Sequence, residues 1–165
     1  MTTVSTRTKL PEAKEVRDLL TLLLDRPIDL ALGTPLVLEA GERATYATFV
    51  DDRLAMRAVA VADLPFSAYA GGALGLVPPA GIQEAVGQKV LSPAIEENFS
   101  ELLNIFASLM NAEGMPHVKL HVVHGTGEQA SPQVVAMTRI LGRRLDLELT
   151  VGGYGRGRLS LVVIA

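Results

Sequence analysis

The sequence predicts an α+β fold, an α/β sandwich in which two long helices cover one face of a mainly antiparallel sheet. The prediction depends on two observations. Helical periodicity is followed by strand-like segments over residues 11–63, and the same order returns over residues 93–165. Each stretch contains one helix and then three strands, so the chain is expected to form a pseudo-two-fold domain from two α-β-β-β units.

Length and composition agree with a single domain. The chain has 165 residues, 48% of them hydrophobic, which is enough for a substantial core over residues 11–165. Residues 1–10 are polar and are expected to be disordered. The absence of cysteine excludes disulfides and thiolate metal sites, and the net charge of −3 disfavours nucleic-acid binding. No apolar run is long enough for a membrane helix, and no signal peptide is evident, so a cytoplasmic location is expected.

The first unit has a helix that ends before Pro27, because proline interrupts helical hydrogen bonding. Its expected elements are a helix over residues 11–25, a strand over 28–32, and a hairpin with strands over 44–50 and 53–62. Two further helices, over residues 65–76 and 81–91, form an insertion between the units. Glycines in the first of them, from Gly71 to Gly75, are interpreted as a surface for close packing.

The second unit begins with the clearest helix of the sequence. Its expected elements are a helix over residues 92–114, a strand over 118–123, a short helix within an insertion over 125–142, and strands over 144–151 and 158–165. In the first strand, Val118, Leu120 and Val122 should face the core. The last strand is apolar on both faces near its end, so it must be central or covered, and a homodimer would be one way to cover it.

The helix over residues 92–114 carries start and stop signals. Ser92 is a suitable N-cap, Pro93 suits the first helical position, and Gly114 is a suitable C-terminal residue. Its apolar face consists of Ile95, Phe99, Leu102, Phe106, Leu109 and Met110.

A narrow polar stripe follows the opposite face of this helix. It consists of Glu97, Glu101, Asn104, Ser108 and Asn111, and at 3.6 residues per turn it spans only about 80°. A solvated helix face is the simplest interpretation of such a stripe. The stripe contains no lysine or arginine, however, whereas a face serving solubility usually mixes charges. It is therefore also a candidate site, with Glu101 and Asn104 at its centre and Glu97, Ser108 and Asn111 as contacts at its rim.

Other possible sites have weaker support. His117 and His121 share one face of the expected strand while His124 points to the other, and no nearby carboxylate completes a metal site. The glycine-rich stretch from Gly152 to Gly157 lacks the helix that a phosphate-binding loop requires, and it is interpreted as a hairpin turn. No metal site is expected.

The E-x-x-N motif formed by Glu101 and Asn104 resembles the motif of the CheC/CheX/FliY family of chemotaxis phosphatases. The order of elements over residues 11–165 is also similar to that family. The resemblance implies hydrolysis of the phospho-aspartate on a CheY-like receiver domain, with Asn104 orienting the attacking water and Glu101 pairing with a receiver lysine. It implies no cofactor of the protein's own, since the receiver supplies Mg²⁺.

Several positions depart from the family pattern. Glu97 stands where Asp or Ser is more usual, and Gly127 stands where a proline is common. In the first unit Asp18 replaces the asparagine, which predicts one active site, as in single-site CheX. Two alternatives remain open: a non-catalytic module that binds a receiver or a flagellar switch protein, and a small-ligand domain, for which the sequence shows no pocket.

Overall fold

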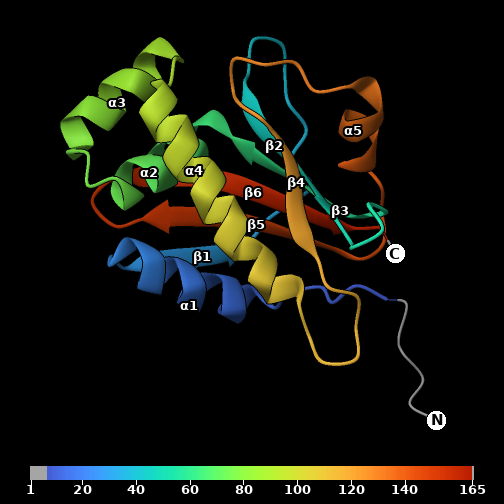
Figure 1. The fold of residues 1–165 in the computed structure, drawn as a ribbon. Coiled ribbons are helices and arrows are strands. Elements are labelled where there is room, and N and C mark those ends of the chain that lie inside the picture. The colour runs from blue at the N-terminus through green and yellow to red at the C-terminus, as the bar shows by residue number, and fades with distance from the viewer. Residues whose placement is uncertain (1–6, 165) are drawn as a thin grey trace.

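The computed structural model describes residues 7–164, which form one six-stranded sheet flanked by helices (Figure 1). The strands are β1 (Ile28–Leu32), β2 (Ala44–Val50), β3 (Met56–Asp63), β4 (Lys119–His124), β5 (Arg144–Val151) and β6 (Gly155–Val163). The helices are α1 (Ala13–Leu24), α2 (Leu64–Leu74), α3 (Pro79–Gln88), α4 (Pro93–Phe106), the 3₁₀ helix η1 (Ala107–Met110) and α5 (Pro132–Met137). This arrangement confirms the predicted α+β fold.

The strand order reveals the two-fold relation between the units. The order is β1-β5-β6-β3-β2-β4, and all neighbouring strands are antiparallel. Exchanging the equivalent strands β1 with β4, β2 with β5 and β3 with β6 reproduces the same order read backwards. The pseudo-two-fold axis therefore passes between β3 and β6, and α1 and α4 are its equivalent helices.

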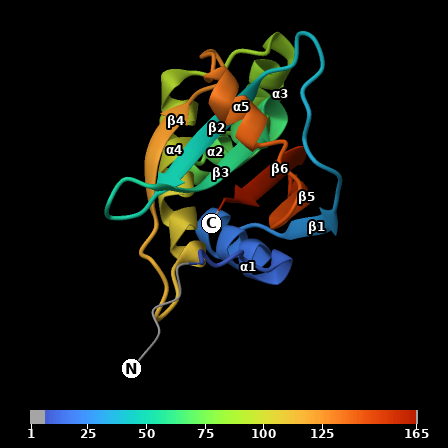
Figure 2. The same cartoon turned by 90° about the vertical axis from the view of Figure 1, so that its right-hand side faces the viewer.

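Helices α1, α2 and α4 cover one face of the sheet and share the main hydrophobic core with it. The other face is covered by α5 and the connection over residues 33–43 (Figure 2), around a smaller cluster that includes Leu36, Tyr46 and Val134. Helix α2 was predicted to be part of an insertion, but it is central. Nine of its eleven residues are buried between α4 and β6, and this burial accounts for its almost wholly apolar composition.

The apolar last strand is accounted for within one chain. β6 pairs with β3 and β5, and Val162 and Val163 are only 1% and 6% exposed. The strand begins at Gly155, three residues before its predicted start, because the glycine-rich turn is shorter than expected. The feature that suggested a homodimer thus requires no second subunit.

One prediction about β4 is wrong. His121 is the extra residue of a β-bulge, since Thr48 lies opposite Val122 while Phe49 lies opposite Leu120. A bulge shifts the alternation of side chains by one residue. Leu120 and Val123 therefore pack against the main core, whereas Val122 is 37% exposed.

Two expected boundaries also differ. The helix predicted to end at Gly114 ends at Phe106, continues as η1 to Met110, and leaves Asn111 in an extended conformation. Residues 1–6 of the expected disordered segment lie outside the described residues. Residues 7–10 of that segment are ordered, because Thr8 is buried and Lys9 forms an ion pair with Glu15.

No helix within residues 7–164 is long and apolar enough to cross a bilayer.

The predicted packing role of Gly71 leads to a stability prediction. A Cβ at this position would lie 2.5 Å from the backbone oxygen of Ile95, so Gly71→Ala must push α2 away from α4. We expect a loss of about 1–3 kcal/mol in the free energy of unfolding. The matched control is Gly87→Ala in α3, where no atom lies within 4 Å and alanine should stabilise by up to about 1 kcal/mol. Chemical denaturation measures both, and equal effects would contradict the packing role.

Candidate functional site

Helix α4 is held firmly at its start and along its buried face. The Ser92 hydroxyl accepts a hydrogen bond from the Ile95 backbone N–H at 3.3 Å, and Pro93 occupies the first turn, as the sequence predicted. Phe99 packs edge-on against Phe66 of α2, with ring centroids 5.7 Å apart. These contacts fix which face of α4 points outward.

The central residues of the polar stripe are exposed on that outward face. Glu97, Glu101 and Asn104 of α4 and Ser108 of η1 are all exposed, and within residues 7–164 none of their side chains forms a hydrogen bond or ion pair. A carboxylate and a carboxamide one helical turn apart are thus free to bind a partner. The stripe offers a carboxylate for a cation and, at Asn104, both a donor and an acceptor.

Asn111 differs from the other four. It follows the end of η1, and its side-chain oxygen accepts a hydrogen bond from the Val118 N–H at 2.7 Å. Its side-chain nitrogen donates to the Val118 oxygen at 3.1 Å. Both polar groups therefore fasten the chain entering β4, and the structure separates Asn111 from the stripe on α4.

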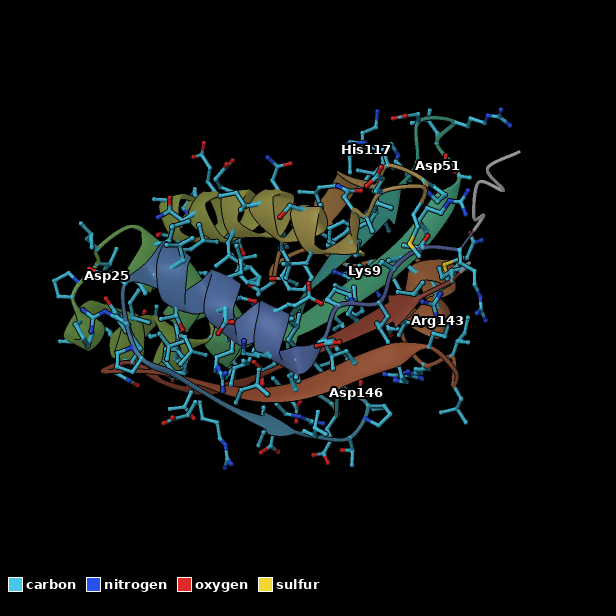
Figure 3. The ribbon with its side chains drawn as sticks, turned by 90° about the horizontal axis from the view of Figure 1, so that it is seen from below. Lys9, Asp25, Asp51, His117, Arg143 and Asp146 are labelled. Atoms are coloured by element: carbon cyan, nitrogen blue, oxygen red, sulfur yellow. The ribbon has the colours of Figure 1, made fainter. Side chains whose placement is uncertain are left out.

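The two acidic residues at the equivalent positions on α1 already form ion pairs within the chain. Glu15 and Asp18 lie on α1 at the positions of Glu101 and Asn104, and the buried series Val16, Leu20 and Leu24 matches Leu102, Phe106 and Met110. Lys9, labelled beside the start of α1 in Figure 3, donates to Glu15 at 2.7 Å. Its hydrogen bond and that from the Glu12 N–H lower the pKa of the Glu15 carboxyl.

Asp18 also has partners, since Lys14 and Arg17 each lie 3.6 Å from its carboxylate. The two units thus differ in charge balance, because α1 carries its own cations beside its carboxylates whereas the stripe of α4 has none.

Glu96 has a role that sequence reasoning missed. Its carboxylate accepts hydrogen bonds from the Thr126 N–H at 3.1 Å and the Thr126 hydroxyl at 2.8 Å. This clamp joins the first turn of α4 to the loop after β4. A small cleft of about 120 Å³ lies beside it and is lined by Glu97 and Ser100, among others. No local sequence signal pairs residues thirty positions apart.

The histidines do not converge. His117 lies 3.7 Å from Asp52, at the end of the sheet where Figure 3 labels Asp51. His124 lies 3.6 Å from Glu128. Within residues 7–164 no three histidine or acidic side chains are grouped closely enough to hold a metal ion. The stretch from Gly152 to Gly157 includes the β5–β6 hairpin turn, as predicted.

Comparisons with known proteins place this geometry on a known fold. No family model matches the sequence, and no curated protein matches it. Among solved structures, the FliM middle domain from H. pylori superposes with a TM-score of 0.60 at 9% identity, covering 92% of this chain and 84% of that one. A chain of the FliG–FliM complex from H. pylori gives 0.58 at 8% identity, with coverages of 92% and 85%.

A third structure is the CheX–CheY–BeF₃–Mg²⁺ complex from Borrelia burgdorferi. Its matching chain has a TM-score of 0.51 and 10% identity, and the match covers 95% of this chain and 100% of that one. This chain has the fold of the CheC/CheX/FliY family. At such low identity the likeness shows the CheX-like fold alone, and the roles of individual residues depend on the site itself.

Proposed function

We propose that the protein is a phosphatase that hydrolyses the phospho-aspartate of a CheY-like receiver domain in chemotaxis or flagellar signalling. One observation carries the proposal: Glu101 and Asn104 are exposed on α4 and have no side-chain partner within residues 7–164, whereas the equivalent pair on α1 is engaged by the chain's own cations. The helix can therefore be inserted into a partner's site from one unit of the fold.

The residue types suit this chemistry. Hydrolysis of an acyl phosphate requires a water molecule in line with the phosphorus, and positioning it is the main task of the enzyme. The Asn104 oxygen can accept a hydrogen bond from that water without placing a negative charge beside the phosphoryl group. Asp18 could not do so without electrostatic repulsion, which supports a single catalytic unit. In the proposal the receiver contributes the Mg²⁺ that neutralises the phosphoryl oxygens.

Glu101 would set the register of the complex. Its exposed carboxylate has no cation nearby on the stripe, so a lysine of the receiver would be its partner. Glu97 and Ser108, one turn to either side of the central pair, would contact the rim of the receiver's site. Glu96 would act indirectly, because its clamp on Thr126 holds the start of α4 against the loop after β4.

The direct test is the lifetime of a phosphorylated receiver. A receiver encoded beside this protein is phosphorylated with a small phosphodonor in the presence of Mg²⁺, and loss of phosphate is followed with and without the protein. Catalytic amounts of the protein should shorten the lifetime of the phosphorylated receiver. An unchanged lifetime with every such receiver would refute the phosphatase proposal.

A non-catalytic binding module is the second candidate, and it is favoured by the comparisons. The two FliM-containing structures superpose with TM-scores of 0.60 and 0.58, above the 0.51 of the CheX complex, and one of them was determined with FliG. In this alternative the stripe on α4 would bind a receiver or a flagellar switch protein without hydrolysis. Binding of a phosphorylated receiver whose lifetime does not change would favour this candidate.

A further inference from the structure

A large groove lies on the face of the sheet opposite to α1, α2 and α4. It has a volume of about 1050 Å³ and is open to solvent. Tyr46 of β2 lines it, Glu42 and Arg43 before β2 bound one side, and the loop over residues 126–132 with α5 bounds the other. Figure 2 shows α5 lying over this part of the sheet. Its volume is sufficient for a small-molecule ligand.

Tyr46 brings an unpartnered polar group to this groove. The residue as a whole is only 9% exposed, and within residues 7–164 its hydroxyl forms no hydrogen bond. Burial raises the pKa of the Tyr46 hydroxyl, which therefore stays protonated at neutral pH and is available as a donor. The hydroxyl oxygen is not among the buried polar atoms that lack a partner, so it reaches the solvent of the groove and can donate to a ligand there.

Arg139 supplies a positive charge to the same region. It follows α5, lines the groove and is exposed, and within the described part of the chain its guanidinium has no hydrogen bond or ion pair. Its charge acts on Tyr46, where it opposes the effect of burial on the pKa of the hydroxyl. A donor and a cation thus act on the same part of the groove.

Two acidic residues, Glu42 and Glu128, also line the groove, and each has a basic residue nearby. Glu128 lies 3.6 Å from His124. Glu42 also lines the neighbouring hollow, where Lys89 and Arg158 supply positive charge. The part of the groove near Tyr46 and Arg139 therefore favours an anion, while Leu38, Ala44, Ala130, Val135 and Ala136 offer apolar contacts beside it.

We propose that this groove binds a small organic carboxylate with an apolar body. The carboxylate would accept hydrogen bonds from the Tyr46 hydroxyl and the Arg139 guanidinium, and the body would lie along α5 and Leu38 of the connection before β2. The site is separate from the stripe on α4, because Tyr46 alternates along β2 with Ala47, which packs into the main core beneath the helices. It does not depend on the proposed phosphatase activity.

The test uses phenylacetate as the probe and phenylacetamide as its uncharged analogue. Both are titrated into the full ¹⁵N-labelled chain, up to about 20 mM, above the millimolar dissociation constants usual for such small ligands. Phenylacetate should shift the backbone amide signals of residues 38–46 and 126–139. Phenylacetamide should bind about tenfold more weakly, because it lacks the charge that strengthens the hydrogen bonds.

Two variants test the assigned residues. Arg139→Gln and Tyr46→Phe should each weaken phenylacetate binding by about tenfold, as expected for loss of a hydrogen bond to a charged group. Arg53→Gln is the matched control, because Arg53 is also an exposed arginine and lies in the β2–β3 turn outside the groove. The absence of shifts, equal binding of the two probes, or equal loss in Arg53→Gln would overturn the proposal.

Discussion

Replacing Asn104 with alanine should lower the rate of receiver dephosphorylation by about 100-fold or more while leaving receiver binding nearly unchanged. The loss follows from the proposed role of Asn104, because positioned groups that act on the attacking water typically contribute factors of 10² to 10⁴. Binding should persist because Glu101 and the rest of the stripe remain. The Asn104 side chain is exposed and has no partner among the described residues, so the free energy of unfolding should change by no more than about 0.5 kcal/mol.

The measurement compares dephosphorylation rates at saturating receiver with dissociation constants for a receiver carrying a phosphate mimic. Asp18→Ala is the matched control, since Asp18 occupies the equivalent position on α1, and it should leave the rate unchanged. Equal rates for wild type and Asn104→Ala would remove Asn104 from the mechanism. Loss of binding together with activity would instead make Asn104 a contact residue.

The second large effect concerns Asp146, which lies on β5 in the lower part of Figure 3. Arg144 binds its carboxylate through two hydrogen bonds of 2.9 and 2.7 Å, and both side chains are about 90% buried. Ser160 donates to it at 2.6 Å and accepts in turn from the Leu36 N–H at 3.0 Å. This network joins β5, β6 and the connection over residues 33–43.

Asp146→Ala should therefore lower the free energy of unfolding by about 3–5 kcal/mol, because it leaves the Arg144 charge buried without its counterion. For a chain of this size that corresponds to a fall in melting temperature of about 10 °C. The control is Arg156→Ala, which breaks the exposed pair of Arg156 with Glu148 on the same hairpin and should cost less than about 1 kcal/mol. Similar losses in the two variants would contradict the importance of burial.

The same network predicts a pH dependence. Burial acts to raise the pKa of Asp146, but the hydrogen bonds from Arg144 and Ser160 outweigh it and leave the pKa below its ordinary value. A lowered pKa in the folded state means that the carboxylate stabilises the fold above its unfolded pKa of about 3.9 and loses that effect as the pH falls through the folded value. Asp146→Ala should thus be less sensitive to acid below about pH 4 than the wild type, as measured by denaturation at several pH values.

Most elements of the fold could be predicted from the sequence because they depend on local periodicity. The alternation in β5, the cap at Ser92 and the repeated order of helix and strands each arise within a short stretch of chain. The motif of Glu101 and Asn104 was found in the same way, since three-residue spacing places both on one face of a helix. The repeat also allowed α1 to be identified as the partner of α4.

The tertiary structure decided which side chains are free. Both Glu15 and Glu101 look alike in sequence, yet Lys9 binds the first, and Glu101 has no partner within residues 7–164. The spacing along the sequence assigned Asn111 to the polar stripe. In the structure the helix ends before Asn111, and the Val118 backbone binds both of its polar groups. Such pairings depend on where the chain returns after a turn, which periodicity does not encode.

The sequence by itself thus determined the elements, their repetition and the candidate helix, because each follows from spacing along the chain. Only the tertiary structure shows that a β-bulge turns Val122 away from the core. It also shows that α2 is central and that a groove lies beside Tyr46. The physical reason is that these features result from contacts between segments distant in sequence. Their partners are chosen by the packing of the whole sheet and its two covering layers.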